Sequence, residues 1–135
     1  MDKAMNYVAL AKKARLIELG EEPVGAVTRA GKGRLVIVAS DAGDHTWRRA
    51  KSFVAGTSQV CVRIPQNKDE LGLAVGRQSL AIAAFTDIAM ALAFLKGLPP
   101  KYPEELAALE DQLARQKQRQ KEAKAHKRNV KTGKK

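Results

Sequence analysis

Cysteine, aromatic residues and long apolar runs are all scarce in this sequence. The single cysteine, Cys61, cannot form an internal disulfide, and within the apolar run 59–64 it is expected to behave as a small buried hydrophobe. One tryptophan, two tyrosines and three phenylalanines are too few for a row of rings that stacks single-stranded bases. No apolar run approaches the roughly 20 residues of a membrane span. We therefore expect a cytoplasmic protein without a membrane partner.

Residue patterns for catalysis are missing as well. His45 and His126 are far apart in the sequence, and with one cysteine no set of three or four metal ligands is recognisable. No Gly-x-Ser-x-Gly turn, phosphate loop or dinucleotide-binding turn occurs. Asp41 follows an apolar run, but a phosphoacceptor would need further acidic groups to hold a metal. We expect no enzyme activity, no metal, no cofactor and no small-molecule substrate.

Positive charge is abundant and unevenly distributed. The 25 Lys and Arg residues exceed the 14 Asp and Glu residues and give a net charge of +11, which favours a polyanionic partner such as nucleic acid. The Gly-Leu-Pro-Pro sequence of residues 97–100 breaks the chain into a domain over 1–97 and a basic C-terminal extension over 98–135. The extension is expected to begin as a helix with Leu106, Leu109 and Leu113 on one stripe. It then continues as a helical or disordered tail.

Apolar runs alternate with amphipathic segments in the first 97 residues. Strands are predicted over 34–39, 60–64 and 80–85, with a short fourth one at 16–17, because β-branched apolar runs are bounded there by turn residues. Helices are predicted over 3–14, from 21 to the glycines at 31 and 33, across 47–54, over 68–75 and over 87–96. Ser40, Asp41 or Asp44 is expected to cap the third helix. This alternation predicts an α/β fold with helices on both faces of one sheet.

Three separate segments resemble one known family. They are residues 32–42 (Lys-Gly-Arg-Leu-Val-Ile-Val-Ala-Ser-Asp-Ala), residues 64–72 (Ile-Pro-Gln-Asn-Lys-Asp-Glu-Leu-Gly) and residues 73–76 (Leu-Ala-Val-Gly). In this order they resemble the ribosomal-protein L-seven-Ae superfamily of kink-turn RNA binders over residues 5–97. The Leu-Ala-Lys-Lys-Ala sequence of residues 10–14 is similar to its bacterial YlxQ-like branch. The resemblance implies a three-layer α-β-α sandwich with a four-stranded mixed sheet, and binding to a sharply bent RNA.

The resemblance also implies two RNA-contacting elements, the first turn of the second helix and the loop before the last strand. In the family the first element often has the pattern Gly-x-Asn-Glu-x-x-Lys. Here Gly20 matches, whereas Glu22, Pro23 and Ala26 stand at the three readout positions. The second element falls on residues 76–79. We predict an RNA site from both elements and the basic residues around them, namely Gly20, Glu21, Glu22, Arg29, Lys32, Arg34, Lys68, Arg77, Gln78 and Ser79.

Other interpretations of these residues stay open at this point. Acidic residues in a first turn also stabilise the helix dipole, and exposed basic residues are often simply solvated. For the whole protein the favoured hypothesis is a non-catalytic, ribosome-associated protein that binds structured RNA, ribosomal RNA included, with sequence-independent phosphate contacts from the tail. A second hypothesis is a protein-interaction module that uses Trp47, Leu106, Leu109 or Leu113. A third is an accessory domain of an RNA-modifying enzyme.

Overall fold

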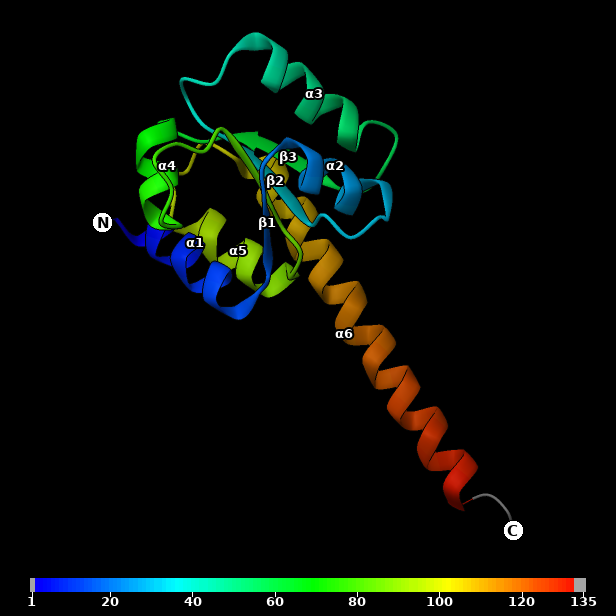
Figure 1. Cartoon of the computed structure of the whole chain (residues 1–135). Helices are drawn as coiled ribbons and strands as arrows, with labels where there is room; N and C mark the ends of the chain where they lie inside the picture. The colour runs from blue at the N-terminus through cyan, green and yellow to red at the C-terminus, as the bar shows by residue number, and fades with distance from the viewer. Residues whose placement is uncertain (1, 133–135) are drawn as a thin grey trace.

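Six helices and four strands make up the described part of the chain (Figure 1). The computed structural model describes the backbone of residues 2–132 and the side chains of residues 2–125. In chain order the elements are α1 (Lys3–Ala14), β1 (Ile17–Leu19), α2 (Glu21–Arg29), β2 (Leu35–Val38), α3 (Asp44–Val54), β3 (Val60–Arg63), α4 (Lys68–Ala74), β4 (Ile82–Phe85), α5 (Ile88–Lys96) and α6 (Pro103–Thr132). Every strand and helix predicted from the sequence is present, with ends that differ by a few residues.

The four strands form one mixed sheet in the order β1-β4-β2-β3. β4 pairs antiparallel with both β1 and β2, whereas β2 and β3 run parallel. The two central strands, β2 and β4, are buried along their whole length, which explains why they appear in the sequence as continuous apolar runs. The predicted four-stranded mixed sheet is confirmed.

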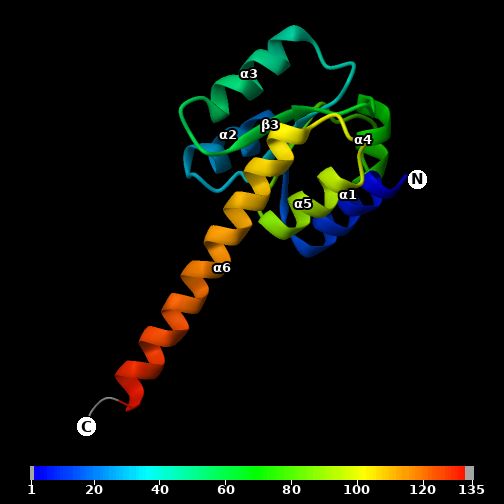
Figure 2. The same cartoon turned by 180° about the vertical axis from the view of Figure 1, so that it is seen from behind.

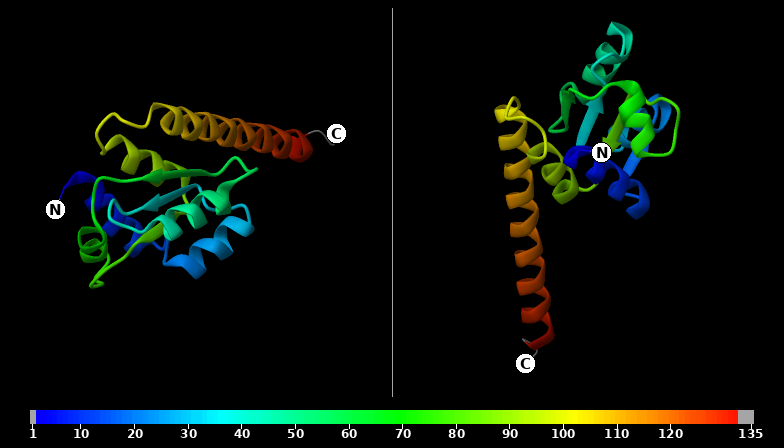
Figure 3. Two further views of the ribbon diagram at one scale, coloured as in Figure 1. Left: turned by 90° about the horizontal axis from the view of Figure 1, so that it is seen from above. Right: turned by 90° about the vertical axis from the view of Figure 1, so that its left-hand side faces the viewer.

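Helices cover both faces of this sheet. α2 and α3 lie on one face, and α1, α5 and the first part of α6 lie on the other, as the view from above in Figure 3 shows. On α1, the stripe of Ala4, Val8 and Ala11 is buried in the core. The rings of Phe85 on β4 and Phe94 on α5 have their centroids 4.9 Å apart and join the sheet to this helical layer. The three-layer α-β-α sandwich predicted from the sequence is therefore confirmed.

The C-terminal extension is helical as far as the structure describes it. The first turns of α6 pack against α5 and β3, where Leu109 is fully buried and Leu106 and Leu113 are half-buried. The rest of α6 projects away from the sandwich (Figure 2). Of the two predicted forms of the tail, the backbone is helical through Thr132, whereas residues 133–135 and the side chains after residue 125 lie outside the described residues. None of the described helices is long and apolar enough to cross a membrane.

The prediction for the cap of α3 is wrong. The N-cap residue of α3 is Gly43, and no side chain caps this helix. Asp41 instead accepts a hydrogen bond of 2.8 Å from the backbone N–H of Lys68, at the start of α4. The carboxylate of Asp41 thus supports a helix that starts 27 residues further along the chain. The division of the chain after residue 97 stays a prediction, since the first turns of α6 cover part of the sandwich.

Candidate nucleic-acid interface

The two elements predicted to contact RNA meet at one end of the sheet. β1 and β4 are antiparallel neighbours, so the end of β1 lies beside the start of β4. The backbone N–H of Gly20, which immediately precedes α2, donates a hydrogen bond of 3.0 Å to the carbonyl oxygen of Ile82. The loop of residues 76–79 leads into β4 at this same end. The first turn of α2 and this loop are therefore spatial neighbours although some fifty positions separate them in the sequence.

A hollow of ≈ 400 Å³ opens between these two elements, and we call it the Arg77 hollow. It is lined by Lys12, Arg15, Ile17, Glu18, Leu19, Pro23 and Arg77. Three of these side chains are cationic and come from two distant segments, the end of α1 and the 76–79 loop. Glu18 is the one acidic residue in the lining. The net positive lining makes the hollow suited to an anionic ligand.

Lys12 and Arg15 are functional candidates that are not among the RNA-site residues predicted from the sequence. Arg15 follows α1 with a backbone φ of 60°, in the left-handed region that glycine normally occupies at this position. Its N–H donates to the carbonyl oxygen of Lys12 at a distance of 3.2 Å, which closes the helix. An arginine in a conformation that disfavours side chains is a reason to look for a function. In the sequence, the only signal was the basic last turn of α1 immediately before β1.

The 76–79 loop is held by contacts to α4. Gly76 has a φ of +77°, and the N–H of Arg77 donates to the carbonyl oxygen of Gly72 at 2.8 Å. A side chain at position 72 would stand 2.8 Å from backbone atoms of Ser79, so only glycine allows the loop to lie directly on the helix. The side chains of Arg77, Gln78 and Ser79 are all exposed. The loop therefore presents three polar groups on a fixed backbone.

Lys68 is the first residue of α4 and lies next to the point where the 76–79 loop ends. Its carbonyl oxygen accepts a hydrogen bond of 3.0 Å from the N–H of Leu80. The side chain is half-buried and does not line the Arg77 hollow. Lys68 thus positions the backbone where the loop enters β4.

The first turn of α2 offers backbone donors beside the hollow. Gly20 is the N-cap residue, with φ 96° and ψ 164°, a conformation open essentially to glycine alone. No side chain caps this turn, and the N–H groups of Glu21 and Glu22 have no partner within the helix. Pro23 has no N–H. The partial positive charge of the helix start adds to that of the three nearby cationic side chains.

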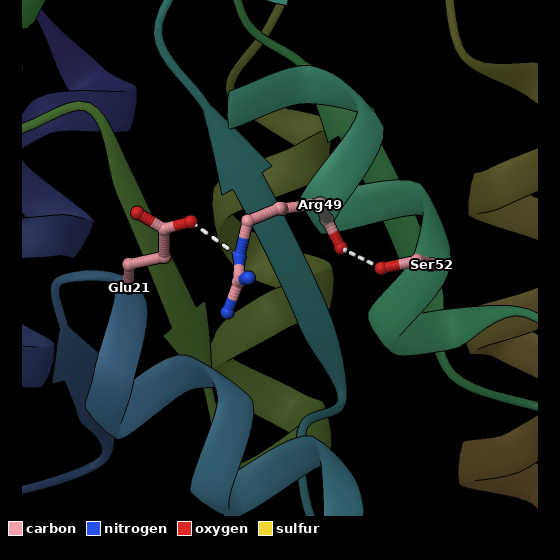
Figure 4. A network of polar contacts seen from close by, with 3 residues as sticks. All are labelled: Glu21, Arg49 and Ser52. Carbon is pink, nitrogen blue, oxygen red and sulfur yellow. Dashed lines mark hydrogen bonds and ion pairs between the residues drawn. The ribbon is translucent and has the colours of Figure 1, made fainter. Parts of the chain in front are cut away.

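Glu21 is turned toward α3 rather than toward the hollow. Its carboxylate forms an ion pair with the guanidinium of Arg49, while the hydroxyl of Ser52 donates to the Arg49 carbonyl oxygen at 2.7 Å (Figure 4). The guanidinium also lies 5.3 Å from the centroid of the Phe53 ring. Both partners of the ion pair are partly exposed, so the pair contributes at most about 1 kcal/mol to stability. Glu22 is exposed and is the carboxylate left free for a ligand.

The basic residues predicted around the turn between α2 and β2 are distributed over different surfaces. Arg29 lies on the outer face of α2, where it lines a surface depression with Glu22 and Arg49. Lys32 is exposed on the turn itself. The N–H of Arg34 donates to the carbonyl oxygen of Phe85 at 2.7 Å, at the end of the sheet opposite to Gly20. Arg34 is not among the residues that line the Arg77 hollow.

Three of the four apolar residues suggested as anchors for a protein partner pack within the chain itself. Leu109 is fully buried, and Leu106 and Leu113 pack against the core. Trp47 is half-buried, with the Arg63 guanidinium 5.1 Å and the Lys51 ammonium 5.6 Å from its ring centroid. Of the four suggested anchors, Leu109 is therefore inaccessible, and two cations flank the ring of Trp47.

Comparison with known proteins identifies the fold. No protein-family model and no curated protein matches the chain. Among solved structures, a protein with unknown function from Bacillus halodurans is similar with a TM-score of 0.66 and 26% identity, over 71% of this chain and 96% of that one. The Giardia lamblia 15.5kD RNA binding protein is similar with a TM-score of 0.60 and 19% identity, over 81% of this chain and 86% of that one. Both similarities cover more than two thirds of this chain.

Proposed function

We propose that this protein is a non-catalytic RNA-binding protein, and that the Arg77 hollow with the first turn of α2 is its principal contact surface. The observation that carries the proposal is the convergence of Lys12, Arg15 and Arg77 on one hollow beside an uncapped helix start. Arginine and lysine side chains and helix N–H groups are the donors that bind phosphate oxygens in protein–RNA complexes. The Giardia protein has a similar fold and is named an RNA binding protein, which supports an RNA-binding function for this chain.

The preferred ligand in this proposal is a sharply bent RNA. A regular A-form helix offers side chains little beyond its phosphates and 2′-hydroxyl groups, whereas an irregular junction also exposes base edges. The exposed carboxylate of Glu22 can accept hydrogen bonds from amino or imino groups of such bases, while Gln78 and Ser79 can donate or accept. The resemblance to kink-turn binders, and to their YlxQ-like branch, points to the same class of RNA. A ribosomal RNA in the cytoplasm is the target we favour.

A gel-shift titration of the full chain tests this function. The probes are an RNA hairpin interrupted by a bulge and tandem G·A pairs, and an uninterrupted hairpin of equal length. We expect tighter binding of the bent RNA, and a roughly tenfold loss for Arg77→Gln, because a hydrogen bond to a charged group contributes about 1.5 kcal/mol or more. Arg48→Gln is the matched control, since Arg48 is exposed on α3 and does not line the hollow.

Two outcomes would contradict the proposal. Equal affinity for the bent and the uninterrupted hairpin would remove the specificity for bent RNA. Equal losses for Arg77→Gln and Arg48→Gln would show that the Arg77 hollow has no special part in binding, and that only the total positive charge matters.

A further inference from the structure

One face of α6 becomes polar and basic where the helix leaves the sandwich. The residues Gln112, Arg115, Gln116 and Arg119 follow the i, i+3, i+4, i+7 spacing of a single helical face. They line a hollow of ≈ 200 Å³ together with Ser58 and Arg34, which we call the Arg34 hollow. Its volume is several times the space of about 30 Å³ that one water molecule takes in the liquid. The hollow is thus enclosed by α6 on one side and by the residues preceding β2 and β3 on the other.

Hydrogen bonds hold both walls of the Arg34 hollow in place. The buried side-chain amide of Gln112 donates to the carbonyl oxygen of Ser58, which fixes α6 against the segment before β3. The side chain of Gln59 accepts from the N–H of Gly33 at 2.8 Å and donates to the carbonyl oxygen of Thr28 at 3.0 Å. The backbone at Gly33 and Arg34 is therefore held in place, since the N–H of Arg34 also donates to the carbonyl oxygen of Phe85, and Arg34 lines the hollow together with residues of α6.

The charged residues that line the Arg34 hollow are all positive. Arg34, Arg115 and Arg119 place three guanidinium groups on it, and no acidic side chain is among its lining residues. Arg115 also pairs with Asp111 at 3.2 Å, on the exposed surface of α6, where such a pair is weak. Like charges gathered around one hollow repel each other unless an anion lies between them. The planar fork of arginine matches the oxygens of a phosphate group.

The Arg34 hollow and the Arg77 hollow lie on different strands of the sheet. The Arg77 hollow follows the edge strand β1, whereas the Arg34 hollow lies at the start of β2, on the other side of β4. Neighbouring strands are about 4.8 Å apart, so β1 and β2 are separated by roughly 10 Å. A single small anion cannot occupy both places, but the repeating phosphates of one polynucleotide can.

We propose that the Arg34 hollow is a second binding site for the RNA backbone, separate from the Arg77 hollow. This inference rests on the proposed RNA-binding function and adds the path of the ligand. The RNA follows the sandwich from the start of α2 to the base of α6, where its phosphates bind Arg34, Arg115 and Arg119.

Binding of the bent RNA hairpin to two double variants of the full chain, measured by fluorescence anisotropy across a range of salt concentrations, tests this inference. R34Q/R119Q removes two charges from the hollow, and K117Q/K121Q removes two from other faces of α6. We expect R34Q/R119Q to lower the slope of log affinity against log salt concentration by roughly 1.4 to 1.8, at about 0.7 to 0.9 per phosphate contact. The control should lose less than half as much. R119Q alone, on an exposed position, guards against misfolding of the double variant.

The results separate this inference from the proposed function. Equal slopes for the two double variants, with the specific binding of wild type intact, would overturn the second site and leave the Arg77 hollow unaffected. No binding of RNA by wild type would overturn both. Titration with inorganic phosphate alone distinguishes a free anion from a backbone. A saturable phosphate site that R34Q/R119Q abolishes, with no change in RNA binding, would assign the hollow to a free anion and refute the inference.

Discussion

Arg15 combines an unfavourable backbone conformation with a place at the candidate interface. A residue other than glycine in the left-handed region costs roughly 1 to 2 kcal/mol, and Arg15 has this conformation with φ 60°. Any helix-ending glycine would relieve the cost, so the arginine is better explained by its position in the Arg77 hollow than by folding. We therefore expect the Arg15 side chain to contribute to RNA binding and not to folding.

Arg15→Gly therefore should separate stability from binding. We expect the free energy of unfolding to stay within about 1 kcal/mol of wild type, in the direction of higher stability, since glycine adopts this conformation without strain. RNA affinity should nevertheless fall roughly tenfold with the loss of one guanidinium. Denaturant unfolding and anisotropy on the same samples measure both quantities. A variant that is clearly less stable, or that binds RNA as wild type does, would contradict this account of Arg15.

The thiol of Cys61 provides a second test at the residue scale. Burial raises its pKa from 9.0 to about 12, with a further rise from Glu105 and opposing effects of Lys51 and Arg63. The folded state thus binds the thiol proton more tightly than the unfolded state does. Its contribution to stability is fully present below pH 9 and is lost as the pH rises toward 12.

We accordingly expect wild type to lose more stability than Cys61→Ala between pH 8 and pH 11. Lysine and tyrosine groups also titrate in this range, and Cys61→Ala serves as the control that shares them. Urea unfolding of both proteins at several pH values gives the comparison. Parallel curves for the two proteins would show that Cys61 is not desolvated in the folded state.

Among the elements, α6 has two roles along its length. Its first turns supply Leu109, fully buried against the sandwich, whereas the side chains of 117–125 are exposed and include four cations and one acidic group. The same helix thus closes the core and then leaves it. Residues 1–97 without these turns would expose part of α5 and the edge strand β3.

Leu109→Ala should destabilise the protein by about 2 to 4 kcal/mol, because it removes a buried side chain and leaves a cavity. Leu73→Ala is the matched control, since Leu73 on α4 is 70% exposed and its loss should change stability by less than about 0.5 kcal/mol. Thermal or urea unfolding measures both variants. If the two substitutions had equal effects, α6 would not be part of the folded core.

Elements were predictable from the sequence wherever the signal is local. The apolar runs of β2 and β4, the start of the α5 helix at residue 87 and the leucine stripe of α6 are all recognisable within a few residues. The cap of α3 was not, because Asp41 bonds to the start of α4 instead. A local pattern cannot reveal which of two helices a carboxylate will serve, since that depends on how β2 and β3 pair.

At the scale of the whole molecule, the candidate site was predictable only in part, because it depends on how the strands pair. The start of α2 and the 76–79 loop were identified through the resemblance, and the pairing of β1 with β4 does bring them together. That same pairing adds Lys12 and Arg15, which no local motif distinguishes from solvated charges. Arg34 is close to α2 in sequence, yet the direction of β2 places it at the opposite end of the sheet, next to α6.

Amide chemical shifts of the full chain, recorded during titration with the bent RNA hairpin, test the central claim most directly. The account predicts that the largest changes cluster at Gly20–Glu22, at residues 12–15 and at Arg77–Ser79, with a second group at Arg34 and along residues 115–119. Changes confined to α3 around Trp47, or spread evenly over the exposed lysines and arginines, would contradict it.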